Sequence, residues 1–204
     1  MEFRVPTDDE MNVLNEKFRY NDEEAKYWHA VCERHQLVPN DTYAVAGFLK
    51  GVLADVRQKF PHSSPLVRKA IYEYAKRLER IGTFRMEGHD LRARSDVMLN
   101  AADLYLEADE ILGFLSDYAF RQLESCGGAI QFREEAGLKD EIVKLGLIER
   151  VQKLSAAIFS AIGTNQVTFV NVDSPFARDL RAQSVKCVDD IVKVYEPAPA
   201  HPQN

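Results

Sequence analysis

Apolar residues recur at helical spacing through most of the chain. They return every three or four positions between 45 and 60, and the same spacing continues over 66–81 and 97–118. The two-residue alternation that is typical of strands is confined to short runs. The pattern therefore predicts an all-α protein, a bundle of about six or seven helices.

Helix starts are marked by residues that cap amino termini. Asn21 precedes a run of three acids, which the helix dipole favours in a first turn. Asn40 or Asp41 precedes the second apolar stripe, and Ser64 precedes Pro65, a pairing expected at a helix start. These signals predict helices over 21–36, 41–60 and 64–82, after a first helix that begins at Thr7.

The most regular stripe predicts one long central helix over 90–126, around which the others pack. Its apolar positions alternate steps of four and three without interruption. Cys126 is followed by two glycines, which suit a helix end and a turn. The main stripe comprises Val97, Ala101, Leu104, Ala108, Ile111, Leu115 and Tyr118, with Met98, Ala102, Tyr105 and Leu112 beside it.

Helical spacing continues over 138–162, with a break expected at Gly146. One strand-like run, 166–172, is rich in β-branched residues and needs a partner, so a minor two-stranded β ribbon with 2–5 is expected. A final helix is predicted up to residue 195. We therefore expect a single helical domain over 1–195, followed by a proline-containing disordered tail over 196–204.

Glycines on the 41–60 helix suggest a close contact. Gly47 and Gly51 lie one turn apart, so a neighbouring helix is expected to approach there.

Composition narrows the class of protein. The 204 residues are 46% hydrophobic and 28% charged, which is ordinary for a globular domain and argues against disorder. The three cysteines are far apart and form no CxxC pair, as expected of reduced thiols in a cytoplasmic protein. No apolar signal core opens the sequence, and no apolar run approaches the roughly 18 residues of a membrane span, so we expect no membrane association.

Charge is unevenly distributed along the chain. The net charge is −6, which lowers the expectation of a nucleic-acid binder. Residues 66–95, however, hold eight basic side chains against four acidic ones. This stretch has two interpretations. It is either a solvated face with ion pairs between residues four positions apart, or a surface that binds an anion, a nucleic acid or an oppositely charged partner. The anion-binding candidates are Arg68, Lys69, Lys76, Arg77, Arg80 and Arg85.

Catalytic and metal-binding patterns are weak. His29, Cys32 and His35 share a predicted helix, but no second ligand pair exists to complete a metal site. His89 and Asp90 are candidates for a base with an orienting acid, although either residue equally suits a helix cap. No phosphate loop, dinucleotide fingerprint or nucleophile elbow occurs, so no cofactor is expected.

Three classes of function remain open. The first is a protein interaction or assembly module without catalytic activity, self-associating as a homodimer through surplus apolar surface at Leu112, Ile158 and Phe159. The second is an enzyme or small-ligand binder with His29 or His89 in a bundle pocket. The third is a polyanion or nucleic-acid binder that uses the basic stretch over 68–94.

Overall fold

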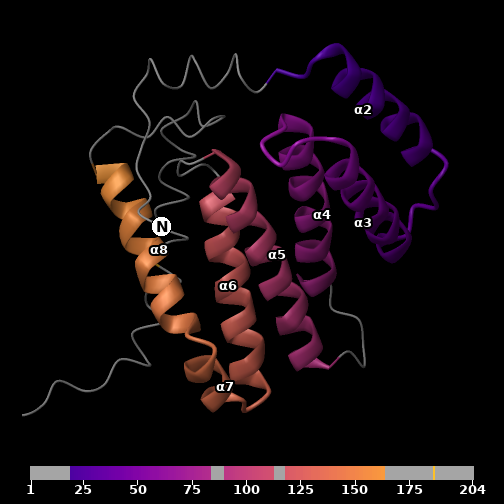
Figure 1. Cartoon of the computed structure of the whole chain (residues 1–204). Coiled ribbons are helices and arrows are strands. Elements are labelled where there is room, and N and C mark those ends of the chain that lie inside the picture. Colours follow the sequence, from indigo (N-terminus) through magenta and orange to yellow (C-terminus); the bar gives the residue numbers. More distant parts are fainter. Residues whose placement is uncertain (1–18, 84–89, 113–117, 164–185, 187–204) are drawn as a thin grey trace, which may run out of the picture.

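The computed structural model describes residues 19–83, 90–112, 118–163 and 186, and within these ranges every regular element is a helix. The helices lie side by side as a bundle, which confirms the all-α prediction (Figure 1). In chain order they are α2 (Asp22–His35), α3 (Thr42–Lys59), α4 (Pro65–Thr83), α5 (Leu91–Leu112), α6 (Tyr118–Glu135), α7 (Lys139–Lys144) and α8 (Leu147–Gly163).

The predicted amino-terminal caps are confirmed. Asn21 and Glu24 form a capping box, in which each side chain accepts a hydrogen bond from the other residue's backbone nitrogen at 2.9 Å. The Asp41 carboxylate accepts hydrogen bonds from two backbone nitrogens at the start of α3. Each cap satisfies donors that a helix end leaves without intrahelical partners, so these starts agree with the sequence.

The prediction of a single long helix over 90–126 is wrong, because two helices, α5 and α6, occupy this region. Helix α5 ends at Leu112, and α6 runs from Tyr118 through Gly127 and Gly128 to Glu135. The two pack against each other more extensively than any other pair of described helices does. A helix between two neighbours buries two faces, and α5 lies against both α4 and α6. The two neighbours thus account for the doubled stripe among the described residues of α5.

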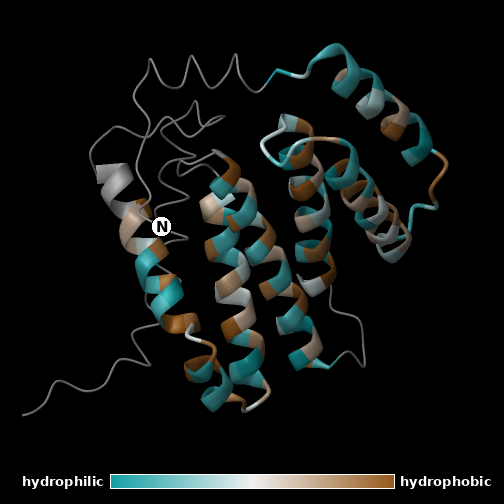
Figure 2. Ribbon diagram, in the orientation of Figure 1, coloured by the Kyte–Doolittle hydropathy of each residue, from teal (hydrophilic) through white to brown (hydrophobic). Residues whose placement is uncertain are grey.

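A hydrophobic core lies where α3, α4 and α5 meet. Val56, Leu66, Ile71 and Tyr105 have no exposed surface there, and Val31 joins them from α2. Figure 2 shows brown, apolar residues on the bundle helices and a mostly hydrophilic α2. Burial of apolar surface is the main stabilising term of such a bundle, and α2 adds only a small share.

The close helix contact lies around Met98 of α5. A Cβ at Gly82 would come within 2.5 Å of the Met98 sulfur, and a Cβ at Gly128 within 2.9 Å of its terminal methyl. The prediction of a close helix contact at Gly47 and Gly51 is wrong, since a Cβ added at either position would meet nothing within 4 Å. Both of those glycines are exposed on α3.

One buried arginine ties α5 to α6. The Arg133 guanidinium donates to the Ser95 hydroxyl and, at 2.5 Å, to the Asp96 carboxylate. Ser95 in turn donates to the Ala129 carbonyl oxygen at 2.6 Å. Arg133 is only 2% exposed, and its ion pair with Asp96 supplies the charge compensation that a buried guanidinium requires.

The predicted break at Gly146 is confirmed. Gly146 has φ +62°, a left-handed conformation that glycine adopts without steric cost, and it separates α7 from α8. Several other expectations lie outside the described residues. These are the first helix from Thr7, the ribbon of 2–5 with 166–172, the helix leading to residue 195 and the tail 196–204. Among the helices that the structure describes, none is long and apolar enough to cross a membrane.

Candidate anion-binding cleft

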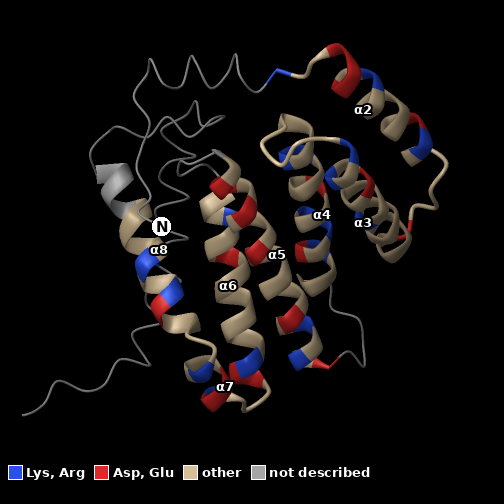
Figure 3. Cartoon of the chain, viewed as in Figure 1, with Lys and Arg blue, Asp and Glu red and all other residues tan. Residues whose placement is uncertain are grey.

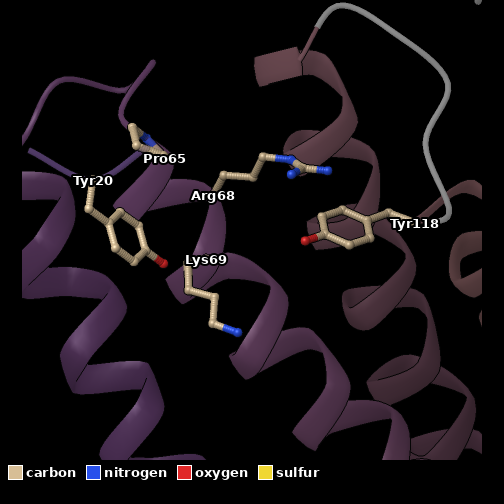
Figure 4. A pocket seen from close by; sticks show the side chains of 5 residues that line it. All are labelled: Tyr20, Pro65, Arg68, Lys69 and Tyr118. Atoms are coloured by element: carbon tan, nitrogen blue, oxygen red, sulfur yellow. The ribbon is translucent and has the colours of Figure 1, made fainter. Parts of the chain in front are cut away.

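Three segments far apart in the sequence meet at a small cleft (Figure 4). Tyr20 precedes α2, the residues Pro65, Arg68 and Lys69 belong to the start of α4, and Tyr118 begins α6. The cleft has a volume of about 130 Å³ and is partly open to solvent. We refer to it as the cation–aromatic cleft.

A buried carboxylate joins the two helix starts beside this cleft. Glu24 is 4% exposed, and its carboxylate accepts a hydrogen bond from the Ser64 hydroxyl at 2.5 Å. The Ser64 oxygen also accepts from the backbone nitrogen of Leu66, in the first turn of α4. The capping group of one helix is thus bonded to the capping group of the other. This arrangement holds Tyr20 next to the first turn of α4.

Arg68 connects three helices at the centre of the cleft. Its guanidinium carbon lies 4.3 Å from the centre of the Tyr118 ring, a cation–π contact between α4 and α6. Its Nε donates to the carbonyl oxygen of Ala108, near the end of α5. These contacts restrict the arginine, so a ligand would meet a positive charge that is already oriented.

Three tyrosines, Tyr72, Tyr105 and Tyr118, pack together beside this arginine. Tyr118 stacks on Tyr72 with ring centres 4.7 Å apart and planes inclined by 16°. Tyr105 lies 6.1 Å from each of these rings and is fully buried. Its hydroxyl donates to Glu79 at 2.8 Å, and burial raises the pKa of Tyr105 far above its usual range. The Tyr105 phenol therefore keeps its proton, and its hydrogen bond fixes its ring.

Two lysines extend the positive face along α4. The Lys69 ammonium lies 2.7 Å from the Glu73 carboxylate and 5.9 Å from the centre of the Trp28 ring. Both Lys69 and Lys76 lie over Tyr72, at 5.7 and 5.9 Å from its ring centre. Together with Arg68, these lysines give the surface three cations, and Glu73 pairs with Lys69.

Tyr20 contributes a neutral hydrogen-bond donor. Burial, together with the nearby carboxylates of Glu24 and Glu73, raises the pKa of Tyr20 to about 12. Its phenol therefore keeps its proton at neutral pH, and Figure 4 shows the hydroxyl directed toward Lys69. A neutral hydroxyl donor beside cationic side chains is suited to a carboxylate or another small anion.

The structure brings together part of the predicted basic set. Arg68 and Lys69 line the cleft, and Lys76 lies on Tyr72 one turn further along. Arg77 is partly exposed and Arg80 is exposed on α4, and neither lines the cleft. Arg85 lies outside the described residues. The ion pair of Lys69 with Glu73, expected from their spacing, is also present.

The candidate catalytic residues lie elsewhere. His29 is exposed on α2 and pairs with Glu33 at 3.4 Å. Asp90 caps α5, where its carboxylate accepts a hydrogen bond from the Arg92 backbone nitrogen at 2.9 Å. His89 lies outside the described residues. Within the described ranges, no three histidine, cysteine or acidic side chains gather as metal ligands would.

The interface candidates are placed only in part. Ile158 is fully buried against the rest of the chain, together with its neighbours Val151 and Leu154. The side chains of Leu112 and Phe159 lie outside the described part of the chain. The described apolar face of α8 therefore packs against the rest of the chain.

Comparison of the chain with models of protein families, with curated proteins and with solved structures yields no match. Any statement about function thus rests on the chain's own geometry.

Sequence reasoning missed the two tyrosines of the cleft. Tyr118 stands in the apolar stripe that predicted the long helix, where it reads as a core residue. Tyr20 precedes a helix cap and carries no motif. Their sequence positions give no sign that they meet Arg68, because the meeting depends on how α2, α4 and α6 pack.

Proposed function

We propose that this chain is a helical protein-binding module whose cation–aromatic cleft receives an acidic side chain of a partner. The observation that carries the proposal is the convergence of Arg68, Lys69, Tyr20 and Tyr118, from three separate segments, on one small cleft. Basic residues that are restricted by stacking lose less conformational entropy on binding than mobile ones do. A preorganised positive site of this kind favours a carboxylate ligand.

The size of the cleft favours a side chain over a whole metabolite. Sites for small molecules and cofactors occupy about 300–1,000 Å³, whereas this cleft has about 130 Å³. A single carboxylate-bearing side chain fits such a volume. The remaining contacts of a partner would then lie on the surrounding surface of α2 and α4.

Nucleic acid is the less favoured ligand. Single strands bind by stacking bases on exposed aromatic rings. Here the ring of Tyr118 already contacts Tyr72 and Arg68. The ring of Tyr72 also makes cation–π contacts with two lysines. The net charge of −6 opposes a phosphate backbone as well.

Binding of a fluorescent octaglutamate peptide tests the proposal, with octaglutamine as the uncharged comparison. Fluorescence anisotropy is recorded near 0.1 M ionic strength, where the Debye length is about 10 Å. The double variant Arg68→Glu with Lys69→Glu should bind at least about tenfold more weakly, a loss of about 1.4 kcal/mol. Circular dichroism verifies that this variant retains its helices.

The matched control is Lys50→Glu with Lys144→Glu. Both lysines are exposed, neither lines the cleft, and the net charge changes by the same amount. This control should bind the peptide like the unaltered protein. Equal weakening in both double variants would mean that only net charge matters, and the proposed site would be wrong.

A further inference from the structure

We infer that α2 is a detachable arm, which undocks from the bundle as a unit and completes the cation–aromatic cleft only while it is docked. The inference rests on the proposed function where it concerns the cleft. The undocking itself is a property of the fold, so it can be measured without any ligand.

The first reason is how little of α2 is buried against the rest of the chain. Figure 1 shows α2 at the outer edge of the bundle, and it packs less closely against its neighbours than any other described helix does. Of its 14 residues, only Glu24 and Val31 are buried. Figure 3 shows charged residues of both signs along it. A helix that buries so little apolar surface gains little from docking.

The second reason is that polar groups supply the shortest attachments of α2. The Glu24 carboxylate accepts a hydrogen bond from the Ser64 hydroxyl at 2.5 Å. The Tyr27 hydroxyl donates to the Asp55 carboxylate of α3 at 2.6 Å. When α2 undocks, all four groups exchange these bonds for bonds to water, so the net contribution of each bond to docking is modest.

The third reason is that the attachments of α2 share one face. They recur every three or four positions, the spacing that aligns side chains along a helix. Tyr27 and His35 lie against Phe60 and Phe48 of α3, with ring centres 5.4 and 5.7 Å apart. The attaching residues are Glu24, Tyr27, Trp28, Val31 and His35. Release of this one face therefore frees the whole helix.

The linker between α2 and α3 permits such a movement. It spans residues 36–40, and Leu37 is 85% exposed. The backbone nitrogens of Leu37 and Val38 donate to the carbonyl oxygens of Arg34 and His35, at the end of α2. These bonds stay intact when the arm moves. A few residues at the end of an element are sufficient to absorb a hinge motion.

Docking of α2 places one wall of the cleft. Tyr20 stands one residue before the Asn21 cap, and the capping box connects that cap to Glu24. Glu24 in turn bonds to Ser64, directly before α4. When this bond opens, Tyr20 leaves the start of α4 together with the arm. A ligand that contacts Tyr20 therefore favours the docked arm, and by linkage the docked arm favours the ligand to the same extent.

Native-state hydrogen exchange of the full chain tests the undocking. The backbone amides of α2 should exchange through one shared opening, at least about a hundredfold faster than the core amides of α4 and α5. Val31→Ala should accelerate exchange throughout α2 by at least about tenfold and leave α4 and α5 unchanged. Exchange of α2 only together with the whole bundle would overturn the inference. So would amides that open one by one from the helix ends.

A matched pair of aspartate substitutions separates docking from the rest of the fold. Val31→Asp places a charge in the buried contact and should release α2, whereas Ala30→Asp alters an exposed neighbour. Trp28 is the only tryptophan of the chain, so its emission reports on α2. The emission should shift to longer wavelength in Val31→Asp alone, while the remaining helices still unfold cooperatively by circular dichroism. Loss of cooperative unfolding in both Val31→Asp and Val31→Ala would show that α2 is an integral part of the bundle.

Octaglutamate connects the arm to the cleft. It should slow the exchange of α2 in the unaltered protein. It should also bind Val31→Asp at least about tenfold more weakly than Ala30→Asp, which has the same net charge. Equal binding by these two variants would overturn the inference and leave the proposed function intact. Failure to bind the unaltered protein would instead contradict the proposed function and the linkage, and hydrogen exchange would still decide whether α2 undocks.

Discussion

The guanidinium carbon of Arg68 lies 4.3 Å from the centre of the Tyr118 ring, although fifty positions separate the two residues. This contact joins the start of α4 to the start of α6 and places a positive charge in the cleft. We expect Arg68→Gln and Tyr118→Leu to be coupled by about 0.5–2 kcal/mol in a double-mutant cycle of unfolding free energies. Strictly additive effects would mean that the contact contributes nothing.

Glu24 should be far more important for stability than the acid before it. It accepts hydrogen bonds from the Ser64 hydroxyl and the Asn21 backbone nitrogen. Glu24→Gln should lower the free energy of unfolding by about 2 kcal/mol, since hydrogen bonds to a charged group are lost at a buried site. Exposed Glu23→Gln should change it by less than about 0.5 kcal/mol. Urea unfolding of both variants measures the difference.

The two glycines around Met98 should respond differently to alanine. At Gly82 a Cβ meets the Met98 sulfur at 2.5 Å and its Cγ at 2.7 Å, so the whole side chain must move. We expect Gly82→Ala to destabilise by about 1–3 kcal/mol, as overpacking does. At Gly128 the terminal methyl is met at 2.9 Å, whereas the Met98 Cγ lies at 4.0 Å, an ordinary contact distance. Gly128→Ala should be neutral or stabilise by up to about 1 kcal/mol through helix propensity. Thermal unfolding of the pair checks the order.

Stability should fall in alkaline solution. Burial and the hydrogen bond to Asp55 raise the pKa of Tyr27 to about 12 from its ordinary value near 10. A raised folded-state pKa means that this stabilisation is complete below pH 10 and is lost as the pH rises toward 12. Tyr27→Phe should reduce the alkaline loss measured by urea unfolding. An identical pH profile in the variant would contradict this assignment.

The described cysteines should differ in reactivity. Cys126 is fully buried, and burial raises the pKa of its thiol to about 11, whereas Cys32 is exposed on α2. In a Cys187→Ser background, one thiol should react quickly with a disulfide reagent at neutral pH. The second should react only at the rate of unfolding. Cys32→Ser should remove the fast phase, and two fast phases would show that Cys126 is accessible.

Local signals in the sequence predicted the helix starts well. Asn21, Asp41, Ser64 and Pro65 act through groups within a few residues, so their effect does not depend on the rest of the fold. The break at Gly146 is predictable for the same reason. The hairpin of α5 and α6 was missed because an apolar stripe repeats alike in one long helix and in two packed ones. Gly113 and Asp117, a poor helix former and a good capping residue, were the available signal for a break.

From the sequence, the candidate site was predictable only as a local excess of basic residues. The excess of basic residues over 66–95 pointed to α4, and two of the six candidates, Arg68 and Lys69, line the cleft. Tyr20 and Tyr118 could not be found in this way. Their role depends on the contact between three helix starts, which no spacing along the chain encodes.

The most direct measurement of the central claim is a titration of isotope-labelled protein with octaglutamate, followed by nuclear magnetic resonance. The account predicts that chemical-shift changes concentrate on the Arg68 Nε–H and on the backbone amides of Tyr20, Lys69 and Tyr118. They should saturate together and vanish in Arg68→Glu with Lys69→Glu. Shifts centred on another surface, or spread evenly over exposed lysines and arginines, would contradict it.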